Sequence, residues 1–203
     1  MEKAVALLSG GIDSPVAIHL MKDRLDIIAV HFHQKELTDG REIEKVKELA
    51  KILHIRKTYL VPFTAVLKEI VAKCSHQNYY ILQKILMMKA AEIIAEKEKA
   101  KFLITGENLA QVSSQTLSNL ATITSFASLE IFRPVLAFDK QEIIDKAKAI
   151  STYDTSSGPE ICSLLGPKHP ATRSDKENIK KEFGKIDFSL AEESVKKAEV
   201  VVL

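Results

Sequence analysis

A chain of 203 residues with 46% hydrophobic residues is long enough for one large domain with a sizeable core. Its 29 Lys and Arg residues nearly balance its 27 Asp and Glu residues, and a net charge of +2 does not mark a nucleic-acid-binding protein. Two cysteines, Cys74 and Cys162, exclude a disulfide framework, and no apolar run approaches the roughly 20 residues that span a bilayer. No secretory signal opens the chain, so we expect a cytoplasmic protein with no membrane partner.

Short apolar runs alternate with amphipathic segments along the first three quarters of the chain. In residues 41–53, for example, apolar side chains recur at the spacing of an amphipathic helix. Strands separated by helices predict an α/β fold with a doubly wound, mainly parallel sheet and helices on both faces. The expected strands are residues 4–8, 26–32, 57–61, 102–105 and 131–134, and the expected helices are residues 15–22, 41–53, 64–73, 82–97 and 140–150, the last capped by Asp139.

The C-terminal part of the chain differs in character. It is rich in Lys and Glu, has few large apolar residues and ends in a valine run. We expect residues 1–170 to form the sheet domain and residues 171–203 to form a C-terminal appendage that packs on it. The lysines of residues 168–185 could contact phosphates, but acidic residues alternate with them, which favours a solvated face.

A glycine turn joins the first expected strand to the first expected helix. Ser9, Gly10, Gly11, Ile12 and Asp13 are followed by Ser14 and by a proline that suits a first helical turn. Glycines and free amides at a helix start favour an anion, and a carboxylate at Asp13 would repel phosphate unless Mg²⁺ lies between them. The turn therefore predicts a site for a nucleotide pyrophosphate with a metal. The alternative is a plain strand-to-helix turn, and no Gly-Lys-Ser/Thr follows, so the loop is not a Walker motif.

Polar side chains also follow two other expected strands. His31, Phe32 and His33 end the second strand, where His31 and Phe32 could edge an adenine or ribose; the alternative is a structural histidine. A metal site at this pair of histidines lacks carboxylate or cysteine neighbours in the sequence. After the fourth strand comes a run rich in amides and hydroxyls, residues 105–116, in which Gly106 and Glu107 follow the first residue; we expect Glu107 to be a second carboxylate near the metal, against the alternative of a plain loop.

Three cations and one thiol complete the candidates. Lys84, Lys89 and Arg133 are candidate phosphate contacts, against the alternative of solvated surface charges. Cys162 lies in a loop punctuated by proline and glycine, near lysine and histidine, where a thiol can have a lowered pKa and act as a nucleophile; the alternative, which is the more common one for a loop cysteine, is an inert, half-exposed thiol. Cys74 lies in a helical segment, where a structural role is expected.

The glycine turn resembles the SGGxDS signature of the PP-loop ATP pyrophosphatases, which cleave ATP between the α and β phosphates and adenylate their substrates. Several further stretches, in the same order over nearly the whole chain, resemble the ATPase domain of the tRNA 4-thiouridine synthase (tRNA sulfurtransferase, ThiI-like) family. They are LLSGGIDSPVA at 7–17, AVHFH at 29–33, VPFT at 61–64, TGENLAQVSSQTLSNL at 105–120, RPV at 133–135, TYDTS at 152–156 and PEICSLLGPKHPATR at 159–173.

The resemblance implies an adenine nucleotide alpha hydrolase-like fold and an ATP-dependent sulfurtransferase. ATP with Mg²⁺ would adenylate the C4 oxygen of a uridine in tRNA, and a sulfur nucleophile would then displace AMP to leave 4-thiouridine. Asp13 matches the family's essential loop aspartate, which we expect to lie at the metal. Cys162 matches the family's loop cysteine that takes part in sulfur transfer. The implied ATP contacts are Ala6, Leu7, Ser9, Gly10, Gly11, Ile12, Asp13, Ser14, His31, Phe32, Lys84, Gly106 and Gln115.

The sequence also departs from the family pattern. Lys84 stands where bacterial members carry arginine, and Ile161 stands where many carry a second cysteine. The glycine turn begins at residue 9, so we expect no THUMP domain, and no rhodanese-like domain either. We therefore expect tRNA to bind through a separate RNA-binding protein or a homodimer, and sulfur to come from a cysteine desulfurase persulfide or sulfide. Two alternatives stay open: adenylation of a small molecule in thiamine or other sulfur metabolism, and a non-catalytic nucleotide-binding protein.

Overall fold

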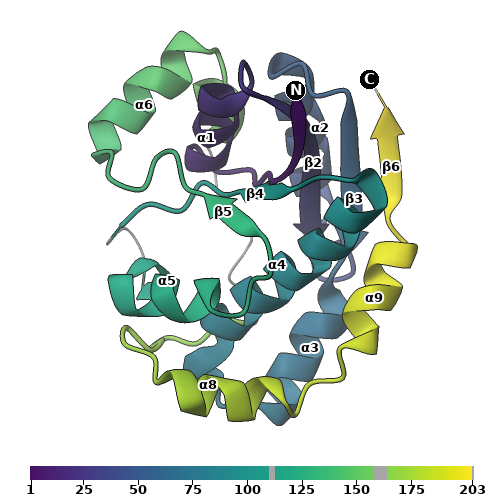
Figure 1. Ribbon diagram of the computed structural model, residues 1–203, viewed down its shortest axis with the longest axis vertical. Helices are drawn as coiled ribbons and strands as arrows, with labels where there is room; N and C mark the ends of the chain where they lie inside the picture. The colour runs from purple at the N-terminus through teal and green to yellow at the C-terminus, as the bar shows by residue number, and fades with distance from the viewer. Residues whose placement is uncertain (110–112, 158–163, 203) are drawn as a thin grey trace.

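The computed structural model describes residues 1–109, 113–157 and 164–202, and their arrangement is shown in Figure 1. A six-stranded sheet runs through the molecule in the order β5-β4-β1-β2-β3-β6. The first five strands are parallel, and β6 pairs antiparallel with β3. The strands are β1 (Glu2–Leu7), β2 (Leu25–His33), β3 (Lys57–Pro62), β4 (Phe102–Ile104), β5 (Glu130–Phe132) and β6 (Glu199–Val202).

Helices cover both faces of this sheet, so the predicted fold class is confirmed. One face packs against α1, α2 and α6, and the other against α3, α4 and α9. Asp139 caps α6 as predicted, in a capping box with Glu142. The helices are α1 (Asp13–Met21), α2 (Arg41–Ile52), α3 (Thr64–Lys73), α4 (Tyr79–Glu98), α5 (Leu117–Thr124), α6 (Lys140–Ala149), α7 (Tyr153–Ser156), α8 (Lys176–Phe183) and α9 (Ser189–Lys196), with 3-10 turns η1 (His76–Asn78) and η2 (Ser113–Gln115).

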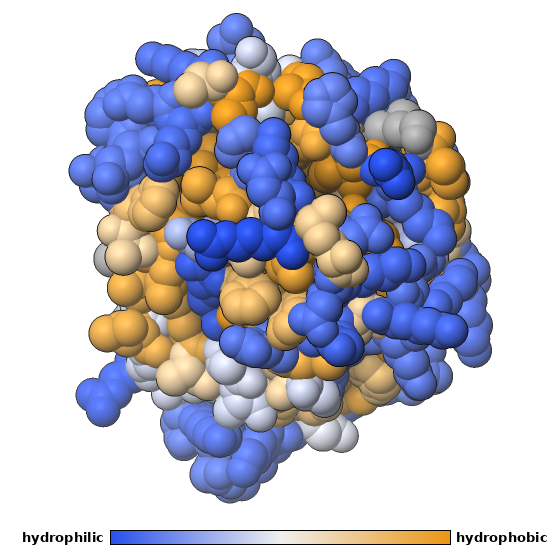
Figure 2. Space-filling model, turned by 45° about the horizontal axis from the view of Figure 1, so that its top comes forward, coloured by the Kyte–Doolittle hydropathy of each residue, from blue (hydrophilic) through white to orange (hydrophobic). Residues whose placement is uncertain are grey.

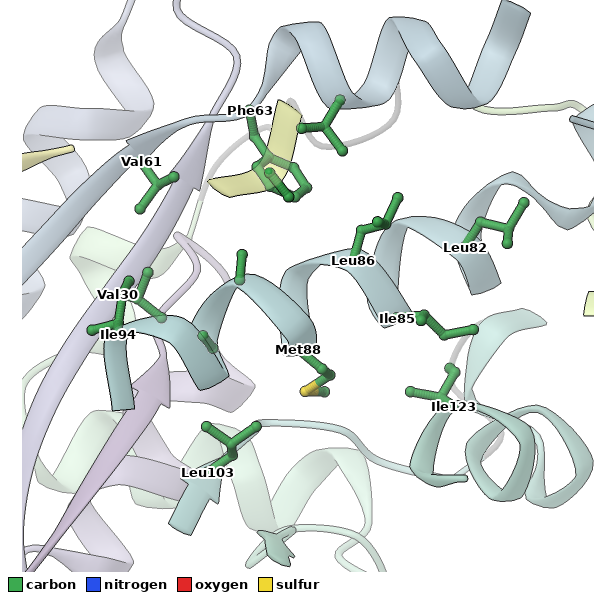
Figure 3. Close-up of a cluster of buried hydrophobic side chains, with 14 of the residues drawn as sticks. Val30, Val61, Phe63, Leu82, Ile85, Leu86, Met88, Ile94, Leu103 and Ile123 are labelled. Carbon is green, nitrogen blue, oxygen red and sulfur yellow. The ribbon is translucent and has the colours of Figure 1, made fainter. Parts of the chain in front are cut away.

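Alternation along the strands separates two hydrophobic cores. Successive strand side chains point to opposite faces, so Val5 joins the core under α4, while Ala4 and Ala6 join the core under α1 and α2. In Figure 3 the long helix α4 lies over the face that carries Val5, and its apolar side chains are drawn beside Val30 and Leu103 of the sheet. The sheet is thereby buried on both sides, as parallel sheets require.

The C-terminal residues extend the sheet. In Figure 1 the yellow chain passes through α8 and α9 and ends in β6 at the edge next to β3. The sequence pattern does not predict this antiparallel strand. The division of the chain at residue 170 stays a prediction.

The chain changes direction around β1. From β1 it moves to β2 and β3 on one side, and it then crosses back through α4 to β4 and β5 on the other. In doubly wound sheets this switch point places the loops after the two central strands on either side of a crevice. Here these are the loops 8–12 and 105–109, which follow β1 and β4.

The outer surface is mixed in character. On the face drawn in Figure 2, hydrophilic side chains predominate, and apolar ones lie between them. Within the described part of the chain, none of the helices combines the length and hydropathy needed to cross a bilayer.

Candidate active site

Two serine hydroxyls close the glycine loop that follows β1. The Ser14 hydroxyl accepts a hydrogen bond from the Ser9 backbone N–H at 2.9 Å and lies 3.0 Å from the Ser9 hydroxyl. The Ser9 hydroxyl in turn accepts from the Gly11 N–H at 3.2 Å. These bonds join the start of the loop to the first turn of α1, so the loop is held in one compact shape.

The amino end of α1 has no side-chain cap. The helix begins at Asp13, and Ile12 occupies the capping position, where it has no side-chain oxygen to accept from the first N–H groups. Pro15 lies in the first turn, where its missing N–H costs nothing. The free N–H groups and the helix dipole at this point favour a negatively charged ligand.

Gly106 brings the loop after β4 against the glycine loop. A Cβ placed on Gly106 would lie 2.5 Å from the Ser14 backbone nitrogen, 2.6 Å from its Cα and 2.8 Å from the Asp13 carbonyl carbon. No side chain fits at these distances. The two loops on either side of the switch point are therefore in direct backbone contact.

Glu107 is a buried carboxylate held between two cations. Its side chain is 2% exposed; one oxygen lies 3.2 Å from Lys84 Nζ and the other 2.7 Å from Arg133 Nε. Burial by itself would raise the pKa of Glu107, but the charges of Lys84 and Arg133 outweigh it and hold the pKa below its usual value. The carboxylate thus anchors two predicted phosphate contacts at the crevice, and both of its oxygens face cations.

His31 presents an unused acceptor at the carboxyl end of β2. Its Nδ1 lies 2.9 Å from the Leu8 carbonyl oxygen, and because a carbonyl only accepts, Nδ1 carries the proton. Burial lowers the pKa of His31 to about 4, so the ring is neutral at neutral pH. Its Nε2 is buried and has no hydrogen-bond partner among the described residues. This lone pair can accept from an amino or hydroxyl group of a ligand.

The other predicted contacts lie around the same crevice. Ala6 is fully buried near the carboxyl end of β1, paired with both β2 and β4, and Leu7 pairs with Val30. Phe32 packs against the Phe63 ring with centroids 4.7 Å apart. Gln115 is buried and its Oε1 accepts from the Asn108 N–H at 3.3 Å, which braces the loop after β4.

Lys89 is not brought to this site. It pairs with Glu92 at 2.8 Å and donates to the Ser128 hydroxyl at 3.1 Å, close to the beginning of β5. The glycine loop lies at the opposite, carboxyl end of the parallel strands. The described contacts therefore do not bring Lys89 to the glycine loop, and its role as a phosphate contact stays a prediction without structural support.

The two cysteines differ in what the structure says of them. The Cys74 thiol donates to the Glu182 carbonyl at 3.4 Å, and burial, together with the Glu182 carboxylate, raises its pKa to about 11. Such a thiol is unreactive, which agrees with the structural role expected for it. Cys162 lies outside the described residues, and its catalytic role stays a prediction.

Two lysines at the glycine loop were missed by the sequence reasoning. Lys140 Nζ, at the start of α6, lies 3.3 Å from Asp13 Oδ1. Lys45, on α2, runs beside Gly10: its Nζ lies 3.7 Å from the place where a Gly10 Cβ would be. Both reach the loop only through helix packing, so no sequence spacing could have pointed to them.

In the described chain, no three His, Cys, Asp or Glu side chains gather in a way that could hold a metal ion. Asp13 is the carboxylate at the loop. A magnesium ion commonly takes one or two protein carboxylates and completes its shell with substrate phosphates and water, so Asp13 fits a metal that arrives with a nucleotide.

Comparison with known proteins places these residues in a family. Residues 1–188 match the family model described as "Thiamine biosynthesis protein (ThiI)". Two curated relatives named "Probable tRNA sulfurtransferase", from Acetivibrio thermocellus and Thermus thermophilus, are 42% and 44% identical over 209 and 178 residues. These matches cover 99% and 84% of this chain but 53% and 44% of the relatives, so the chain spans about half of their length.

A solved structure is similar over the whole chain. It is described as "Crystal structure of a 4-thiouridine synthetase - RNA complex with bound ATP", has a TM-score of 0.94 and 37% sequence identity, and is matched over 55% of its own length. The family model thus covers most of the sequence, and both curated relatives exceed 40% identity. The chain belongs to the ThiI family.

Proposed function

We propose that this chain carries the ATP-dependent half-reactions of a tRNA sulfurtransferase that makes 4-thiouridine. The observation that carries the proposal is the backbone contact of Gly106 with Asp13 and Ser14, because it holds the loop after β4 against the glycine loop at the switch point of the sheet, where doubly wound folds bind their ligands. The similar solved structure, whose description names bound ATP and RNA, supports the same assignment.

ATP is proposed to lie with its phosphates on the glycine loop and its base near β2. The free N–H groups of α1 and the cation Lys84 favour the phosphates. The neutral His31, with Nε2 free to accept, favours an amino or hydroxyl group of adenosine. Asp13 would hold Mg²⁺, which supplies charge neutralisation for the triphosphate when it is bound.

The first step transfers adenylate to the uridine. The C4 oxygen attacks the α phosphorus, the bond between the α phosphorus and the bridging oxygen breaks, and pyrophosphate leaves. The positive environment of Lys84 and Arg133, anchored by Glu107, stabilises the charge that develops on the phosphates. Adenylation thereby makes the C4 oxygen, which alone is a poor leaving group, part of AMP, which leaves readily.

The second step replaces AMP with sulfur. A sulfur nucleophile adds to C4, the C4–O bond breaks, and AMP leaves with its electron pair. We propose that a cysteine desulfurase persulfide or sulfide supplies the sulfur and that Cys162 takes part in the transfer. With sulfide as the nucleophile, the exchange leaves sulfur on C4 directly. With a persulfide on Cys162, the outer sulfur bonds to C4 as AMP leaves; a second thiol from outside this chain then attacks the Cys162 sulfur, the S–S bond breaks, the outer sulfur stays on C4, and Cys162 is left in a disulfide with that thiol. We also propose that the reaction takes place in the cytoplasm and that a separate RNA-binding protein or a homodimer helps to hold the tRNA.

Release of pyrophosphate from labelled ATP tests the proposal. Unmodified tRNA should stimulate the release by wild-type protein, and Asp13→Ala should abolish it while the protein stays folded by circular dichroism. Release that is indifferent to tRNA, or that responds instead to a small acceptor, would contradict tRNA as the substrate.

A further inference from the structure

Lys45 lies along the glycine loop although it belongs to a different helix. It stands in the second turn of α2, and Gly10 leaves room for it: a Cβ on Gly10 would lie 3.1 Å from Lys45 Cδ, 3.6 Å from Cε and 3.7 Å from Nζ. The outer half of the lysine side chain thus runs against the backbone that the proposed function assigns to phosphate.

Among the described residues, the charge of Lys45 has no carboxylate partner. Its Nζ donates to the Ser156 carbonyl at 2.9 Å, and no ion pair involves it among the described residues. The other lysines of the site are paired, Lys84 with Glu107 and Lys140 with Asp13. On the same helix, Lys47 lies 3.2 Å from a Glu44 carboxylate oxygen.

The side chain of Lys45 is partly accessible to solvent. A hollow along the outer side of α2 borders Lys45, and its other walls carry Lys51, Glu48 and Glu199, among others. Lys45 is thus a half-buried cation that has no carboxylate partner among the described residues and lies against a loop that favours anions. A negatively charged ligand on that loop would supply the missing opposite charge.

We propose that Lys45 binds the phosphate chain of the nucleoside triphosphate from the α2 side of the glycine loop. The inference rests on the proposed function and adds a residue to it. On binding, one N–H of the ammonium turns to a phosphate oxygen, while the aliphatic part keeps its place over Gly10.

A purely structural role would be a tether between α2 and α7, because Ser156 ends α7. The structure supplies a matched control for that tether. The Thr155 hydroxyl donates to Glu48 Oε1 at 3.2 Å, so Thr155→Val loosens the same junction without changing a charge at the loop. Lys47→Met removes one charge from the same helix but away from Gly10.

The test is calorimetric titration of the full chain with Mg-ATP, with pyrophosphate and with adenosine. Lys45→Met should weaken ATP and pyrophosphate about tenfold, as expected for the loss of one charge-assisted hydrogen bond, and should leave adenosine unchanged. Lys45→Arg should retain most of the affinity, and Lys47→Met and Thr155→Val should bind all three like wild type. Thermal melting checks that each variant is folded, and Lys45→Gln replaces Lys45→Met if the latter does not fold.

Two results would overturn the inference. One is wild-type pyrophosphate affinity in a folded Lys45→Met protein, and the other is an equal loss in Thr155→Val. Wild-type protein that binds neither ATP nor pyrophosphate would contradict the proposed function instead.

Discussion

Replacing Gly106 with alanine should push apart the two loops that form the crevice. The new Cβ would lie 2.5 Å from the Ser14 nitrogen, whereas an ordinary contact begins near 3.4 Å, so the backbone must move by about 0.9 Å. The neighbouring atoms are backbone atoms of α1, which cannot turn aside as a side chain could.

Two magnitudes follow from that movement. Overpacking of this kind costs about 2 kcal/mol, which for a chain of this size lowers the Tm by about 4–8 °C. A displacement close to 1 Å at groups that position a substrate reduces the rate about 100-fold. The loss of pyrophosphate release should therefore exceed what the loss of folded protein explains.

Thermal melting and pyrophosphate release, measured on the same preparations, separate the two effects. Gly184→Ala is the matched control, because a Cβ there would lie 3.5 Å from the nearest atom, the Lys180 carbonyl oxygen. It should melt and turn over like wild type. Wild-type turnover by Gly106→Ala would refute the reasoning that the two loops form one phosphate site.

Three other variants test separate parts of the site. Glu107→Gln leaves two cations without their buried partner, so urea titration should show that the free energy of unfolding falls by about 3 kcal/mol. Because the folded pKa of Glu107 is lowered, the wild-type protein should lose this extra stability as the pH falls below about 4.5, and a difference that is unchanged at pH 3 would contradict the ion-pair account. The folded pKa of His31 is also lowered, so its contribution to stability is complete above the unfolded pKa near 6.5 and decreases as the pH falls towards 4. Between pH 7 and pH 5 the free energy of unfolding of the wild-type protein should fall by about 2 kcal/mol more than that of His31→Gln. Equal pH profiles for the two proteins would show that the ring is not buried and neutral. Cys162→Ala should keep ATP-dependent pyrophosphate release and should no longer form 4-thiouridine, as measured by mass spectrometry of tRNA nucleosides. The control Cys74→Ser should keep both activities, because the Cys74 thiol is unreactive. Formation of 4-thiouridine by Cys162→Ala would remove that cysteine from the mechanism.

The fold could be predicted where local pattern and tertiary structure agree. The strand, glycine turn and helix at residues 4–22 were recognised because the chain there carries both the apolar run and the residues that a tight phosphate turn needs. The helix Thr64–Lys73 was predicted with the same ends that the structure gives it. β6 was not predicted, because four residues at the end of a chain carry no periodicity that names their partner strand.

The residues of the candidate site also divide into those that the sequence pattern indicates and those that only tertiary packing brings to the site. Lys84 and Lys89 were grouped because they share a helix, but five residues turn a helix by about 140° beyond a full turn, so the two side chains leave on different faces. Lys84 reaches Glu107, and Lys89 reaches Glu92. Lys45 and Lys140 reach the glycine loop from helices that the sequence places far from it, and only packing brings them together.

A crystal structure of the chain with a non-hydrolysable ATP analogue and Mg²⁺ tests the central claim most directly. The account predicts phosphates on the glycine loop and the amino end of α1, the metal on Asp13 and the base beside His31 and Phe32. Density for the nucleotide at another place, with Asp13 still paired to Lys140 and the loop without phosphate, would contradict it.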